Sequence, residues 1–74
     1  MEKGETTLEM AERHVREMTA RVARQQDIHA EMVRDNHPEA ARMAQVVLNT
    51  ITDTLDLAIK HRDYLRAQAG KGRD

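Results

Sequence analysis

The stretch RDNHPEAA, residues 34–41, decides the fold, because it joins a helix-stop signal directly to a helix-start signal. Asn36 tolerates the left-handed backbone conformation that commonly follows the last residue of a helix. His37 can occupy the N-cap of the next helix, and Pro38 has a φ angle already suited to the first helical position. So short a connection makes the two flanking helices run antiparallel.

Apolar residues recur at alternating steps of three and four on both sides of this turn. Such a heptad repeat predicts one helix over residues 7–35 and another over residues 38–69, each burying one face against the other. The first stripe consists of Leu8, Ala11, Val15, Met18, Val22, Gln25, His29 and Met32. The second stripe consists of Ala41, Ala44, Leu48, Ile51, Leu55, Ala58, Arg62 and Leu65. We therefore expect an all-α, two-helix antiparallel hairpin.

The ends of the chain carry helix-boundary signals. Thr6 or Thr7 can cap the first helix, with Glu9 in the first turn, where a carboxylate is favourable. Gly70 is expected to end the second helix. The hairpin then forms a single domain over residues 1–74, with frayed tails at residues 1–6 and 70–74.

The second helix carries more apolar surface than one partner helix can cover. A chain of 74 residues without Cys depends on helix packing or self-association for its stability. We therefore expect a homodimer in which two hairpins form a four-helix bundle, with a higher oligomer or a helical partner protein as alternatives. The expected interface consists of Met43, Val47, Ile51, Leu57 and Tyr64.

Two polar residues, Gln25 and His29, interrupt the apolar stripe of the first helix. In an antiparallel pairing they face Leu48 and Ala44, with Asn49 nearby. A polar residue in a coiled-coil seam commonly sets register and oligomeric state at some cost in stability. We assign that role to the pair, with ligand binding or pH sensing as the alternative.

The composition argues against an enzyme. The chain has neither Cys nor Ser, and its threonines lack a neighbouring base and acid that could activate them. Tyr64 is the only aromatic residue, which removes a stacking platform for flat cofactors. The three glycines form no phosphate-binding loop. We expect no catalytic residue and no cofactor.

A histidine-based metal site is one alternative function. His14 and His61 fall at about the same level of the hairpin, and a second chain could complete their ligand set. The Glu-x-x-His signature of di-iron bundles is absent, because Ala11 and Ala58 stand three residues before these histidines. We expect the two side chains to be solvated or hydrogen-bonded rather than metal ligands.

Weak nucleic-acid binding is a second alternative, through Arg13, Arg16, Arg21 and Arg24 on the first helix. The net charge of −1 gives no general attraction to phosphate, and acidic residues are interleaved with these arginines. A solvated helix face laced with ion pairs at i, i+4 spacing is therefore the simpler interpretation. The expected pairs are Glu9–Arg13, Glu12–Arg16 and Glu17–Arg21.

Arg62 is the one basic residue in the seam of the second helix. Its aliphatic part can cover apolar surface while its guanidinium reaches water or a carboxylate. We expect the guanidinium to pair with Glu12 or Glu9 at the open end of the hairpin.

Three segments resemble a family of small alphaproteobacterial proteins of unknown function: AERHVREMTARVARQQDIHAEM, NHPEAARMAQVVLNT and KHRDYL. The matching positions lie between residues 11 and 66, and Asn36 stands where the family has Gly. The resemblance implies a stand-alone helical hairpin in a bacterial cytoplasm and no activity. The sequence also shows no membrane span and no signal-peptide layout, so a soluble cytoplasmic protein is expected.

Overall fold

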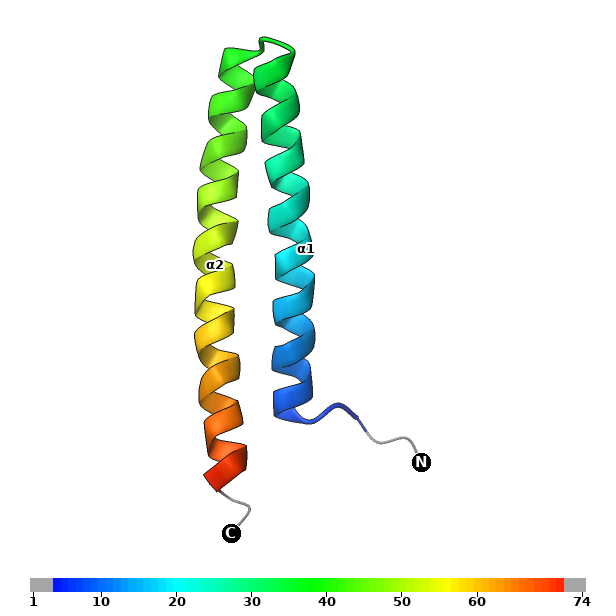
Figure 1. Cartoon of the computed structure of the whole chain (residues 1–74), viewed down its shortest axis with the longest axis vertical. Helices are drawn as coiled ribbons and strands as arrows, with labels where there is room; N and C mark the ends of the chain where they lie inside the picture. Colours follow the sequence, from blue (N-terminus) through cyan, green and yellow to red (C-terminus); the bar gives the residue numbers. More distant parts are fainter. Residues whose placement is uncertain (1–3, 72–74) are drawn as a thin grey trace.

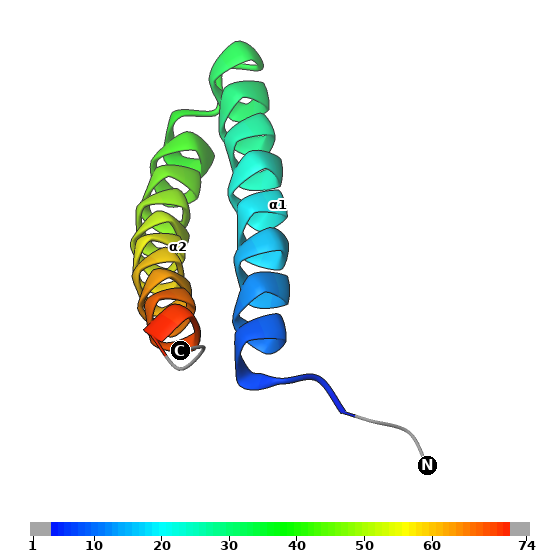
Figure 2. The ribbon, with the colours of Figure 1, turned by 60° about the horizontal axis from the view of Figure 1, so that its bottom comes forward.

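The computed structural model describes residues 4–71, which form two helices and no strand. α1 spans Thr7–Arg34 and α2 spans Pro38–Lys71. The helices lie side by side in both ribbon views, joined by a tight turn at one end (Figures 1 and 2). The described part of the chain is therefore the expected all-α antiparallel hairpin, and its helix bounds lie within two residues of the predicted ones.

α1 begins with a capping box. The Thr6 hydroxyl accepts a hydrogen bond from the Glu9 N–H at 3.0 Å, and the Glu9 carboxylate accepts one from the Thr6 N–H at 2.9 Å. These two bonds satisfy backbone donors that have no partner within the helix. Thr6, rather than Thr7, is thus the N-cap residue.

The turn between the helices has the hydrogen bonds of a Schellman motif. The Asn36 N–H donates to the Val33 carbonyl at 3.1 Å, and the His37 N–H donates to the Met32 carbonyl at 2.9 Å. Asn36 has a φ of 60°, the left-handed conformation predicted for it. The His37 carbonyl accepts from the Ala41 N–H at 2.8 Å, so His37 is the N-cap of α2 and Pro38 follows as its first residue.

The far end of α2 differs from the prediction. Gly70 was expected to end the helix, but α2 continues to Lys71. No described glycine has a positive φ, so Gly70 does not form the left-handed cap that ends many helices. Of the predicted tails, residues 4–6 precede α1 and residues 70–71 are helical, while residues 1–3 and 72–74 lie outside the described residues.

The seam between the helices contains every residue predicted for it. All members of the two heptad stripes are buried or half-buried, including the polar Gln25, His29 and Arg62. The buried ones are Ala11, Val15, Met18 and Ala44. Alanines in the seam leave room for larger side chains on the facing helix, as interdigitated packing requires.

The hairpin is a single layer of two helices, measuring 57 × 28 × 13 Å. Stable domains usually contain at least two packed layers around one core. No large side chain within residues 4–71 is completely buried. The hairpin therefore has a seam but no deep core, and its broad faces stay open.

Candidate interaction surface

The outer face of α2 carries most of the large apolar side chains that the hairpin leaves exposed. Met43 is 70% exposed, Leu57 66% and Tyr64 60%. Val46 and Val47 lie on the same helix and are also exposed. On α1 the exposed large apolar residues are Met10 and Val33, which lie near opposite ends of the helix. The apolar surface available to a partner is thus concentrated on α2.

Four of these exposed residues, Met43, Val47, Leu57 and Tyr64, belong to a second heptad stripe on α2. Each member lies one residue before a seam residue. The second stripe therefore runs beside the seam with the same seven-residue period. We call this the outer stripe. Its members are Met43, Val47, Thr50, Thr54, Leu57, His61 and Tyr64.

The predicted interface residues fit this arrangement. Met43, Val47, Leu57 and Tyr64 lie in the outer stripe, while the half-buried Ile51 belongs to the seam and borders the stripe. Thr50, Thr54 and His61 were not predicted to belong to it. The recurrence of Met43, Thr50, Leu57 and Tyr64 at every seventh position is the signal that identifies it from sequence.

The two threonines of the outer stripe satisfy their own hydroxyl groups. The Thr50 hydroxyl donates to the Val46 carbonyl and the Thr54 hydroxyl donates to the Thr50 carbonyl, each at 3.1 Å. Threonine in a helix commonly makes this bond to the preceding turn. Burial of these side chains against a partner would therefore leave no hydroxyl unpaired, which removes the main cost of covering a polar group.

The equivalent positions on α1 are mostly charged. They include Glu17, Arg21, Arg24 and Glu31, in the same register relative to the seam. Charged side chains are depleted from the centres of protein interfaces because burying them is costly. The two helices thus share one seam pattern but have different outer faces.

Ion pairs on α1 centre on Arg13. Its guanidinium binds both carboxylate oxygens of Glu5, at 2.9 and 3.0 Å, and also the Glu17 carboxylate at 3.1 Å. The hydrogen bonds from Arg13 lower the pKa of the Glu5 carboxyl, against a smaller opposing effect of desolvation. The three predicted pairs do not form among the described residues: Arg13 binds Glu5 and Glu17, and Glu12 binds Arg66.

Gln25 bridges the two helices within the seam. Its side-chain N–H donates to the Ala44 carbonyl at 3.3 Å. The expected neighbour Asn49 is exposed and accepts a hydrogen bond from Gln45 of its own helix at 2.8 Å. Gln25 thus contacts the backbone of α2, and His29, one turn away, is half-buried beside it.

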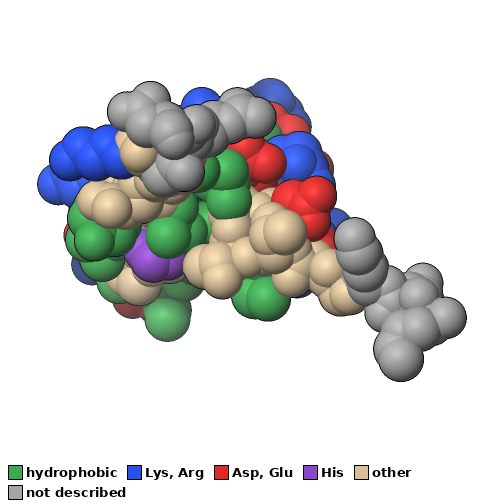
Figure 3. Space-filling view, turned by 90° about the horizontal axis from the view of Figure 1, so that it is seen from below, with side chains coloured by type: hydrophobic (Ala, Val, Ile, Leu, Met, Phe, Trp, Pro, Cys, Tyr) green, Lys and Arg blue, Asp and Glu red, His purple; other side chains and the backbone are tan. Residues whose placement is uncertain are grey.

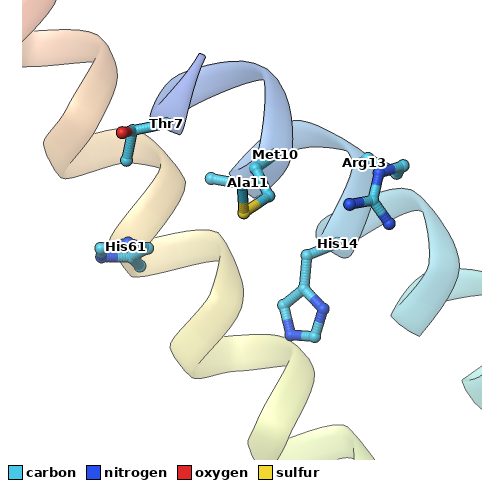
Figure 4. Close-up of a pocket in the computed structure, with 6 residues that line it drawn as sticks. All are labelled: Thr7, Met10, Ala11, Arg13, His14 and His61. Carbon is cyan, nitrogen blue, oxygen red and sulfur yellow. The ribbon is translucent and has the colours of Figure 1, made fainter. Parts of the chain in front are cut away.

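His14 and His61 line the same open hollow near the free ends of the helices. Figure 4 shows His14 extending from α1 and His61 from α2, with Met10 and Ala11 on the wall of the hollow. Its volume is about 370 Å³. Within residues 4–71, no three His, Asp or Glu side chains are grouped so that they could hold a metal ion.

Two hollows of the hairpin differ in polarity. The hollow at His14 and His61 exposes mainly apolar surface, whereas a second hollow on another part of the hairpin exposes mainly polar surface. From the open end, hydrophobic side chains surround a histidine, and acidic and basic side chains gather along another edge (Figure 3). The polar hollow is lined by Gln26, Gln45, Leu48, Asn49, Thr52 and Asp53.

The interhelical ion pair at the open end differs from the predicted one. Arg62 was expected to reach Glu12 or Glu9, but its guanidinium binds the adjacent Asp63 at 2.9 Å. Arg66, one turn further along α2, binds Glu12 at 3.2 Å instead. The Arg62 side chain still covers the seam, since it is only 23% exposed.

Across residues 4–71, neither helix contains a segment both long enough and apolar enough to cross a membrane. No family model, curated protein or solved structure matches the chain.

Proposed function

We propose that this chain is a non-enzymatic interaction or regulatory protein whose working form is a homodimer. Two hairpins join through the outer stripe of α2 and form a four-helix bundle. The observation that carries this proposal is the exposure of Met43, Leu57 and Tyr64, each at least 60%, along one face of a helix that already buries another face. Exposed apolar patches of this kind mark protein interfaces.

The energetics favour covering this face. Burial of one large apolar side chain contributes about 1.5–3 kcal/mol, and five such side chains on α2 are exposed in the single hairpin. Small domains without disulfides gain stability from association, and this hairpin has only one layer of helices. Pairing two hairpins adds the missing second layer.

The same stripe could receive a helix from a different protein, and this is the second form of the proposal. An amphipathic helix binds in an apolar groove through residues spaced three and four apart, which is the spacing of the outer stripe. Methionine adapts its shape to different partners, and Met43 is the most exposed member. Self-association and partner binding would then compete for one surface.

The test is the mass of the protein in solution and its response to a charge in the outer stripe. Light scattering at micromolar concentration should give twice the chain mass of 8.5 kDa. Leu57→Asp should give the single-chain mass, because a carboxylate would have to be buried in the interface. Ala23→Asp is the matched control, since Ala23 is exposed on α1 outside the outer stripe, and it should leave the dimer intact.

A wild-type protein that scatters as a monomer at high concentration contradicts the dimer. Equal loss of the dimer in both variants would show that the outer stripe is not the interface.

A further inference from the structure

The outer stripe requires a partner helix with a matching apolar stripe, and α2 itself has one. α1 does not offer such a stripe, because four of its seven equivalent positions hold charged residues, namely Glu17, Arg21, Arg24 and Glu31. Within the described residues, the helix face complementary to the outer stripe of α2 is therefore the outer stripe of a second α2.

Two charged residues border the outer stripe on its solvent side. Asp53 and Lys60 are exposed and lie seven residues apart, so they occupy the same position in successive heptads. Neither forms an ion pair among residues 4–71. The other residues in this border row are Val46 and Ala67, which are uncharged.

The orientation of the second helix decides what these charges meet. In an antiparallel pair, equivalent border positions of the two helices face each other across the seam. In one register of this antiparallel pair, Asp53 of each copy lies opposite Lys60 of the other copy, and two-fold symmetry forms this contact twice. In a parallel pair the border row instead faces the opposite border, where Ala58 and Leu65 stand, and both charges lack a partner.

We infer that the outer stripe is covered by α2 of a second copy, running antiparallel, in the register that pairs Asp53 with Lys60 of the partner subunit. This inference rests on the proposed homodimer and specifies its geometry. In that register Val47 faces Tyr64 of the partner subunit, and Thr54 faces Leu57 of the partner subunit. In the border row, Val46 meets Ala67 of the partner subunit, so a larger side chain faces a smaller one there.

Disulfide crosslinking tests the orientation, because the chain contains no Cys of its own. In the double variant Val47→Cys with Tyr64→Cys, the two positions lie about 25 Å apart along one helix, at a rise of about 1.5 Å per residue. That is far beyond the limit of about 7 Å between Cα atoms for a disulfide, so any such bond must join two chains. Mild oxidation should convert the double variant almost fully to a covalent dimer.

The single variants are the controls for this experiment. In an antiparallel dimer, Val47→Cys alone and Tyr64→Cys alone place the two thiols far apart, and neither should crosslink. In a parallel dimer each single variant would crosslink with its own copy, and that result overturns the inference.

Charge reversal tests the register by a second route. Asp53→Lys places two lysines opposite each other at both contacts, and should raise the dissociation constant of the dimer by about tenfold. Lys60→Asp should have a similar effect. The combined Asp53→Lys, Lys60→Asp variant restores opposite charges and should return the constant to about the wild-type value. Asp27→Lys, at the equivalent position of α1, should leave it unchanged.

The results separate failure of the register from failure of the homodimer. A wild-type monomer overturns both proposals. Two results would overturn the antiparallel register alone, provided that the wild type is a dimer. One is a double-cysteine variant that does not crosslink. The other is a combined charge variant whose dimer dissociation constant is as high as that of the single variants.

Discussion

The two helices have the same seam pattern but opposite outer faces. On α1, most of the equivalent positions beside the seam hold charged residues, and the Arg13 guanidinium contacts the Glu5 and Glu17 carboxylates. On α2, the equivalent positions hold Met43, Leu57 and other members of the outer stripe. One helix thus has a face suited to water, and the other has a face suited to a second protein surface.

This difference shows why the seam alone does not describe the protein. A heptad stripe on each helix is enough to make the hairpin, and both helices have one. The outer stripe of α2 adds nothing to that hairpin, since its large apolar side chains are mostly exposed. Its regular spacing is an argument for the proposed contact with a second chain.

The largest expected effect compares one methionine in the seam with one in the outer stripe. Met18 is 5% exposed and Met43 is 70% exposed. Met18→Ala should lower the free energy of unfolding by about 2–5 kcal/mol, because it leaves a cavity in the seam. Met43→Ala should lower the free energy of unfolding only slightly in the monomer, and by more where the protein is dimeric.

The measurement for this pair is urea unfolding followed by circular dichroism at two protein concentrations. The loss of unfolding free energy in Met18→Ala should be seen at both concentrations. The loss of unfolding free energy in Met43→Ala should grow with protein concentration. A concentration-independent loss in Met43→Ala as large as that in Met18→Ala would contradict the assignment of Met43 to an intermolecular face.

The next effect concerns the polar residues that α1 places in the seam. Replacing both Gln25 and His29 by Leu should raise the free energy of unfolding by about 1–2 kcal/mol, because two half-buried positions become apolar. The loss of the Gln25 bond to the Ala44 carbonyl should also loosen control of the oligomeric state.

Thermal unfolding and light scattering check the two parts of this prediction. Gln26→Leu is the control, since Gln26 is exposed beside the seam and its replacement should not stabilise the hairpin. A double variant that is less stable than the wild type would identify Gln25 and His29 as a functional site rather than as residues that set the register of the helices.

A smaller effect is expected at the start of α1. Thr6→Ala removes one side of the capping box and should lower the free energy of unfolding by about 1 kcal/mol. Thr7→Ala, one residue further along, leaves the capping box in place and is the control. Similar thermal unfolding curves for the two variants would show that the capping box contributes nothing measurable.

The smallest effect is expected for the ion pair between Glu5 and Arg13 on the polar face of α1. The pKa of Glu5 is lowered from its ordinary value of 4.5, so the folded state favours the charged carboxylate. The stabilisation is therefore present above that pH and is lost as the pH falls through the lowered pKa. Glu5→Gln should melt slightly below the wild type at pH 7, and the difference should disappear in acid.

Thermal melts of both proteins between pH 7 and pH 3 provide the measurement. Arg24→Gln is a matched change to an exposed charge on the same helix and should not reproduce this pH dependence. A difference between Glu5→Gln and the wild type that persists unchanged in acid would exclude the ion pair as its source.

The hairpin can be predicted from the sequence, because local rules fix each of its parts. The heptad period places Ala11, Val15 and Met18 on one helix face, and all three are buried. The backbone preferences of Asn36 and Pro38 favour a tight turn between two helices. These features depend on backbone conformation and on the burial of apolar side chains. A given residue has few favourable choices of either.

The tertiary structure selects the partners of the polar side chains. Arg66 rather than Arg62 reaches Glu12, Arg13 binds Glu5, and Gln25 bonds to the Ala44 backbone. Exposed ion pairs are worth only about 0–1 kcal/mol each, so several partners of similar energy compete for each long side chain. The crossing of the two helices selects the partners of Arg66 and Gln25, and a linear pattern of charges does not contain that geometry.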